Sequence, residues 1–155
     1  MDSIEIKTRP ENIFEYFVHL DENYRAWHPD HVKCSWLKGK PAKEGSILYV
    51  EEYLHGKLHK LKFLITKIEP NRKIKFKLLF PISIICPTGS FIIESKEKRC
   101  IFTATLSFRF GWLFSKFARN RVEAIKKHIK EEGENIRKNC REIEKWVRKY
   151  TFTTF

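Results

Sequence analysis

An uninterrupted helical pattern of apolar residues, from residue 113 to residue 150, constrains the fold of this chain most strongly. Apolar side chains recur every three or four positions, and lysine, arginine and glutamate occupy the opposite side. The apolar stripe comprises Ala118, Val122, Ile125, Ile129, Ile136, Cys140, Ile143 and Val147. A helix of this kind must bury its stripe against a broad apolar surface. The sequence therefore predicts one long C-terminal helix that covers a sheet.

The strand patterns between residues 32 and 110 supply that surface. Lys73–Leu78 alternates strictly between lysine and apolar side chains, as in a strand with one face in water. Residues 99–110 place Cys100, Phe102, Ala104, Leu106, Phe108 and Phe110 on one face. Further strands are expected at residues 32–37, 46–55, 58–69 and 89–96, with short turns between them. Such spacings are typical of hairpins, and they predict an antiparallel sheet.

The amino end adds a short strand at residues 3–8 and two short helices. Thr8 and Glu11 have the spacing of a capping box, so Thr8 is expected to cap the first helix. The second helix is expected at residues 21–27, because Pro29 disfavours helical geometry at His28. The chain is thus predicted to be one α+β domain over residues 1–150, in the order strand, two helices, five or six strands and a helix, with a frayed tail at 151–155.

The composition indicates a domain with an interior cavity. Among the 155 residues, 13 Phe, 5 Tyr and 4 Trp exceed what packing alone needs. Trp27, Trp36 and Phe102 are expected to line the ligand pocket. The formal net charge of +12 indicates either attraction to anionic partners or a well-solvated surface. Neither a signal-peptide pattern nor a Cys-x-x-Cys spacing is present, so a soluble cytoplasmic protein is expected.

Glu132 falls inside the apolar stripe of the long helix, where a carboxylate is unexpected. His128 precedes it by four residues, so the two side chains share one side of the helix. An unpaired buried carboxylate is costly and needs a positive partner. The sequence leaves two partners open, a lysine or arginine and a metal ion.

A second inward carboxylate is expected in the strand of residues 46–55. Glu52 shares the parity of Leu48, Val50 and Leu54, which are the apolar positions of that strand. The alternative is that the alternation in this strand does not separate a buried face from an exposed one, because tyrosines occupy the opposite set of positions. The segment between Tyr24 and His31 adds polar groups at the mouth of the expected cavity.

Two imidazoles and two carboxylates in one cavity suit Zn²⁺, and Fe or Mn is an alternative because carboxylates are hard ligands. We therefore expect one divalent metal site in this chain. Its ligands would be His31 or His28, together with Glu52, His128 and Glu132. The pattern does not decide between the two histidines of the loop. Tyr24, Tyr49 or Tyr53 would be the donor to a phenolic substrate if the site is catalytic.

The order of elements, with Trp27-His28-Pro29 after the second helix, resembles the START and Bet v 1 (SRPBCC) helix-grip superfamily over nearly the whole chain. The resemblance implies a curved antiparallel sheet that wraps around a C-terminal helix and a hydrophobic cavity. Within the superfamily, the chain is similar to the phloretin and diacetylphloroglucinol hydrolases. The matching residues are Tyr24, Trp27, Pro29, His31, His128 and Glu132. This similarity implies hydrolysis of the carbon–carbon bond between an aryl ring and an acyl group at a metal held by two His and two Glu.

Other functions compete with this hypothesis. A carrier or sensor of a hydrophobic ligand or lipid needs the cavity alone and no catalytic residue. Nucleic-acid binding through Lys60, Lys62, Lys73, Lys75 and Lys77 is disfavoured, because no aromatic residues alternate with these lysines to stack bases. His55 and His59 lack a partner at a ligand spacing and are expected at the surface or the pocket rim.

Overall fold

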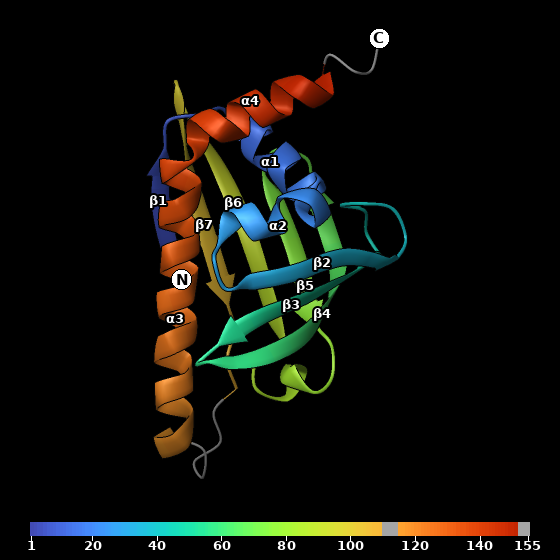
Figure 1. The fold of residues 1–155 in the computed structure, drawn as a ribbon, viewed down its shortest axis with the longest axis vertical. Helices are drawn as coiled ribbons and strands as arrows, with labels where there is room; N and C mark the ends of the chain where they lie inside the picture. Colours follow the sequence, from blue (N-terminus) through green and yellow to red (C-terminus); the bar gives the residue numbers. More distant parts are fainter. Residues whose placement is uncertain (110–114, 152–155) are drawn as a thin grey trace.

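A strongly curved antiparallel sheet forms the body of the protein, whose computed structural model describes residues 1–109 and 115–151 (Figure 1). Its seven strands lie in the order β1-β7-β6-β5-β4-β3-β2, and every neighbouring pair is antiparallel. The strands are β1 (Asp2–Ile6), β2 (His31–Lys38), β3 (Ile47–Leu54), β4 (Lys57–Glu69), β5 (Lys73–Leu78), β6 (Thr88–Lys96) and β7 (Arg99–Leu106). The predicted antiparallel sheet is therefore confirmed.

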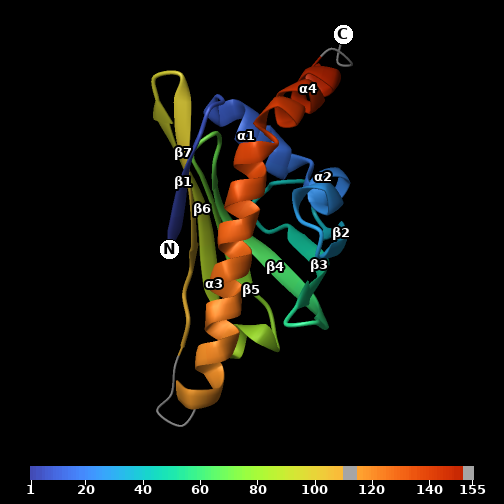
Figure 2. The same ribbon diagram turned by 60° about the vertical axis from the view of Figure 1, so that its left-hand side comes forward.

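The helices lie along the concave side of the sheet. Helix α3 (Ser115–Lys138) runs the length of the molecule in front of the sheet, as Figure 2 shows from the side. Helices α1 (Pro10–Val18) and α2 (Leu20–Trp27) close the end near β2, and a single 3-10 turn (Ile82–Ile84) lies between β5 and β6. The helix-grip arrangement of the sheet and the C-terminal helix is thus confirmed.

The prediction of one continuous C-terminal helix is wrong. The helix ends at Lys138, and α4 (Cys140–Thr151) begins after Asn139 and turns away from the axis of α3 (Figures 1 and 2). Asparagine is a poor helix former, which favours a break at this position. The apolar stripe continues across the break because α4 packs on α1 while α3 packs on the sheet. Residues 113 and 114, and the tail beyond 151, lie outside the described residues.

The predicted capping box at the first helix is also wrong. Arg9 occupies the N-cap position and makes no side-chain cap, and Pro10 opens the helix. The hydroxyl of Thr8 donates instead to Glu144 on α4 at 2.8 Å and accepts from Asn12 at 2.9 Å. Thr8 therefore joins α1 to α4, a tertiary contact that competes with the local cap.

Alternation along β4 and β5 separates a buried face from a charged face. The inward positions of β5 are Ile74, Phe76 and Leu78, and all three are buried. On the opposite face, Lys60, Lys62, Lys75 and Lys77 are exposed. The described helices include none that is long and apolar enough to cross a membrane.

Candidate functional site

A cavity of about 760 Å³ lies between the sheet and α3. Most of its lining is apolar and comes from β3, β4, β5 and α3. Trp27 and Trp36 line it, as expected, whereas Phe102 does not. Phe102 is 3% exposed and stacks on Phe17 at a centroid distance of 5.5 Å, so it belongs to the core beside a smaller second pocket.

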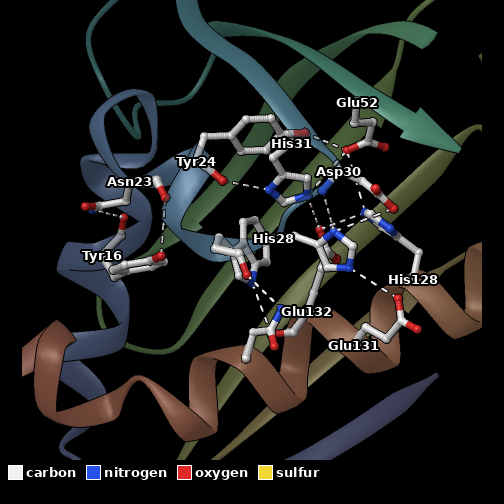
Figure 3. Close-up of polar contacts among 12 residues, drawn as sticks. Tyr16, Asn23, Tyr24, His28, Asp30, His31, Glu52, His128, Glu131 and Glu132 are labelled. Carbon is white, nitrogen blue, oxygen red and sulfur yellow. Dashed lines mark hydrogen bonds and ion pairs between the residues drawn. The ribbon is translucent and has the colours of Figure 1, made fainter.

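Four side chains from three elements meet at the wall of this cavity (Figure 3). His31 begins β2 and lies opposite Glu52 of β3 in the strand register. His128 and Glu132 face them from α3, one helical turn apart. One ligand atom from each of these four residues lies within 4.8 Å of every other. The cluster of His31, Glu52, His128 and Glu132 is called the His/Glu cluster below.

The ring of His31 is fixed in one orientation. It stacks on the ring of Tyr24 at a centroid distance of 3.8 Å and an interplanar angle of 5°. Its Nδ1 lies 2.8 Å from the carbonyl oxygen of Tyr24, and because a carbonyl only accepts, Nδ1 carries a proton. Nε2 then points to Glu132 Oε1 at 2.9 Å and to Glu52 Oε2 at 3.7 Å. In the neutral ring this nitrogen offers a lone pair to the cluster.

His28 is equally buried but has both ring nitrogens engaged elsewhere. The backbone N–H of Asp30 donates to Nδ1 at 3.0 Å, and Nε2 lies 3.2 Å from Glu131 Oε2. Burial and then the nearby His128 lower the pKa of His28, so its ring stays neutral with the Nε2 proton directed at Glu131. His28 therefore flanks the cluster, with its ring centroid 4.3 Å from that of His128.

Tyr24 holds Glu52 in place from the other side. Its hydroxyl donates to Glu52 Oε2 at 2.5 Å, and both side chains are buried. Burial, followed by the charge and the hydrogen bond of Glu52, raises the pKa of Tyr24 far above its ordinary range. Tyr24 consequently keeps its proton and remains a donor to the carboxylate.

The two carboxylates of the cluster have opposite pKa shifts. Burial, and then the charge of Glu132, raise the pKa of Glu52. Burial also opposes the charged form of Glu132, but its pairing with His128 and His31 lowers its pKa overall. The same pairing with Glu132 raises the pKa of His128 although burial lowers it. Glu52 and His128 therefore hold protons more readily than they would in water, while Glu132 stays ionised.

A lysine or arginine partner for these carboxylates was the alternative left open above. Within residues 1–109 and 115–151, neither Glu52 nor Glu132 has a lysine or arginine at ion-pair distance; their ion-pair partners are His31 and His128. The buried Nε2 of His128 makes no hydrogen bond of acceptable geometry and lies 3.4 Å from Glu132 Oε1. An unsatisfied nitrogen beside two buried carboxylates fits a cation between them.

Not every predicted site residue reaches the cavity. Tyr53 lies on the outer face of β3 and is 45% exposed, as the strand alternation after Glu52 requires. It is absent from the cavity lining, so it has no access to a molecule bound there. Tyr49 also lies on that outer face, where its hydroxyl donates to Glu51 at 2.6 Å. Of the three tyrosines considered as donors, Tyr24 lines the cavity.

The contacts that anchor α3 over the site have no sequence signal. Trp27 Nε1 donates to the backbone oxygen of Glu132 at 3.2 Å, and Asn135 Nδ2 donates to the backbone oxygen of Trp27 at 3.1 Å. Both bonds join residues more than 100 positions apart, and each uses one main-chain group. A pattern of side-chain types does not reveal such bonds, although these bonds determine where Glu132 lies.

Comparison with known proteins gives a family and a fold. The sequence profile of a family described as polyketide cyclase / dehydrase and lipid transport matches residues 2–141. No curated protein sequence matches the chain. Among solved structures, the Zhui aromatase/cyclase from Streptomyces sp. R1128 has a TM-score of 0.69 at 14% identity, covering 94% of this chain and 93% of that one.

Two further structures agree with this assignment of fold. Ara h 8.0201 has a TM-score of 0.68 at 15% identity, covering 88% of this chain and 92% of that chain. The di-domain aromatase/cyclase StfQ of steffimycin biosynthesis has a TM-score of 0.73 at 11% identity, covering 91% of this chain and 49% of that one. The chain therefore belongs to the polyketide cyclase / dehydrase and lipid transport family, a small-molecule-binding branch of the START and Bet v 1 helix-grip superfamily.

Proposed function

We propose that this protein is a divalent-metal-dependent hydrolase that cleaves the bond between an aromatic ring and an acyl group. One observation carries the proposal: the His/Glu cluster gathers four ligand atoms within 4.8 Å of one another at the wall of a largely apolar cavity. A small aromatic ketone fits such a cavity, because its ring would contact the apolar wall and its carbonyl would reach the cluster.

The donor set of the cluster fits Zn²⁺, with Fe²⁺ or Mn²⁺ as alternatives. Two imidazoles and two carboxylates are ligands of these ions, and the two carboxylates would balance the charge of one divalent ion. We assign the first imidazole to His31, because His28 uses both nitrogens for Asp30 and Glu131. When bound, the ion would act as a Lewis acid toward the ketone and would raise the acidity of a water molecule.

The chain itself supplies orientation, a hydrogen-bond donor and a site shielded from water. The carbonyl of Tyr24 holds the Nδ1 proton of His31, which directs Nε2 into the cluster. The hydroxyl of Tyr24 orients Glu52 and keeps its proton at Oη, close to where a phenolic substrate would lie. The apolar lining excludes water from the aromatic ring, which strengthens every electrostatic interaction at the cluster.

Turnover of an acylated phloroglucinol tests the proposal. Hydrolysis consumes one water and yields the carboxylic acid and the free phenol, both of which chromatography can quantify. We expect zinc-loaded protein to form both products, Glu132→Gln to form neither, and Glu131→Gln to retain activity. Glu131 is a fair control because it is the adjacent residue on α3 and lies outside the cluster. Zinc-loaded wild-type protein without turnover would contradict the hydrolase.

A non-catalytic carrier of a hydrophobic ligand is the second candidate. The size and apolar lining of the cavity favour it, and the description of the family includes lipid transport. A carrier would bind its ligand equally well before and after Glu132→Gln, because apolar contacts would supply the affinity. Ligand binding without metal and without turnover would therefore favour the carrier function over the hydrolase function.

A further inference from the structure

Part of the cavity wall, as far as the described residues show it, lies at the protein surface. Of the described residues that line it, four are exposed: His55, Lys57, Asn120 and Arg121. They come from the tip of the β3–β4 hairpin and from the first half of α3. His55 Nε2 donates to the backbone oxygen of Arg121 at 3.3 Å and so joins the tip to the helix. We call these four residues the basic rim.

The turn at the tip has a defined shape. His55 and Gly56 both have positive φ, 54° and 71°, as in the tight two-residue turns that suit twisted hairpins. Lys57 follows directly and pairs with Leu54 across the hairpin, on the face that lines the cavity. The backbone of the turn therefore fixes the point from which the Lys57 side chain extends.

The basic rim carries positive charge without a matching acid. Within the described part of the chain, Lys57 and Arg121 have no ion-pair partner, and the carboxylates lining the cavity are Glu52 and Glu132 of the His/Glu cluster. Burial, with His55, Arg121 and Lys57 nearby, lowers the pKa of His59, as expected beside cationic groups. An anionic group at the opening would meet donors that lack a partner.

The basic rim lies a fixed distance from the His/Glu cluster. Arg121 precedes His128 by seven residues on the same side of α3, which corresponds to about 10 Å along the helix. On β3, Leu54, which pairs with Lys57 of the rim, is two residues beyond Glu52, or about 7 Å along the strand. The backbone positions that carry the rim and the cluster are therefore roughly 7 to 10 Å apart, and a ligand that reaches both needs two polar ends joined by an apolar body.

We propose that the basic rim binds a carboxylate of the ligand, so that the natural substrate is an amphipathic aromatic keto acid whose ketone lies at the His/Glu cluster. The length and orientation of this ligand rest on the function proposed above. Recognition of the carboxylate does not, because the rim and the cluster are separate groups of side chains. Opposite charges at the two ends would also set the direction of entry, since Glu52 and Glu132 repel a carboxylate in the absence of metal.

An acetylbiphenyl carboxylic acid and its methyl ester are suitable probes, because two rings separate the ketone from the acid. Their affinities are measured by calorimetry on metal-free protein, where the carboxylate cannot bind a metal ion. We expect the acid to bind at least about tenfold more tightly than the ester, a typical effect of hydrogen bonds to a charged group. The double variant Lys57→Gln/Arg121→Gln should abolish this preference and leave the affinity for the ester unchanged.

Lys62→Gln/Lys75→Gln is the charge-matched control. Both lysines are exposed on the outer face of the sheet and lie outside the cavity lining, so this variant should keep the preference for the acid. Equal affinity for acid and ester, binding of neither, or the same loss in the control would overturn the proposal. Metal content is measured on the same preparations. Protein that prefers the acid but holds no metal would contradict the proposed hydrolase function and leave carboxylate binding at the rim intact. Metal-loaded protein without this preference would contradict carboxylate binding at the rim and leave the proposed hydrolase function intact.

Discussion

His31 Nε2 lies 2.9 Å from Oε1 of Glu132, although 101 positions separate the two residues in the chain. The Nδ1 proton of His31 is held by the carbonyl of Tyr24, so in the neutral ring two lone pairs face each other across this distance. Such an arrangement is unfavourable unless a proton or a metal cation lies between the atoms. This contact therefore calls for a cation between the two atoms, either a proton or a divalent metal ion.

Substitution of the two loop histidines will have unequal effects on zinc affinity. His31→Gln should weaken zinc binding at least about tenfold, because it removes a nitrogen that the structure directs into the His/Glu cluster. His28→Gln should change the affinity little, because His28 binds Glu131 and the backbone of Asp30. Competition with a chromogenic chelator measures both. A loss of affinity in His28→Gln with none in His31→Gln would reverse the assignment.

Tyr24→Phe will destabilise the metal-free protein. The variant removes a buried hydrogen bond to Glu52, for which a cost of about 1 to 3 kcal/mol in the free energy of unfolding is typical. Tyr49→Phe removes a similar bond, to Glu51, on the outer face of the same strand. Water can replace that bond, so the loss should be smaller. Urea unfolding of both variants gives the comparison, and equal losses would argue against a special role for Tyr24.

Stabilisation by zinc will increase as the pH rises from about 5.5 to about 7.5, because the ligands must lose protons before they bind a metal. His128 and Glu52 have raised pKa values in the metal-free fold, for the causes given above. A raised pKa in the folded state adds stability at low pH, and that stability is lost as the pH rises through it. Glu132 has a lowered pKa, so its contribution is already complete over this range.

The melting temperature with and without zinc measures this effect. The metal-free protein should lose stability over the range as His128 and Glu52 give up their protons, while zinc occupies their lone pairs in the bound form. The difference between the two melting temperatures should therefore widen toward pH 7.5. Addition of a chelator should remove the difference at every pH. A zinc-induced increase that is larger at the acidic end would be inconsistent with protons competing at these ligands.

The inward placement of the two carboxylates was predictable from sequence, because it depends on periodicity alone. Glu52 follows the two-residue period of β3, and Glu132 follows the helical period of α3. Both side chains are buried or nearly so, at 12% and 13% exposure. The packing of α3 against the sheet in the helix-grip fold then brings the two side chains together.

The different surroundings of His28 and His31 were not predictable in this way. They depend on the carbonyl of Tyr24, the N–H of Asp30 and the carboxylate of Glu131, and two of these partners are main-chain groups. The break at Asn139 was missed for a related reason. The apolar stripe runs on through Cys140, Ile143 and Val147, and a periodic pattern does not record that the second half faces α1 and not the sheet.

The metal content of untagged protein tests the central claim most directly. After incubation with zinc and exhaustive dialysis, elemental analysis should find about one zinc ion per wild-type chain, as expected for one four-ligand site. Glu131→Gln should retain this content, and Glu132→Gln should lose most of it. Wild-type protein with no bound divalent metal, or Glu132→Gln protein with as much metal as the wild type, would contradict the metal site.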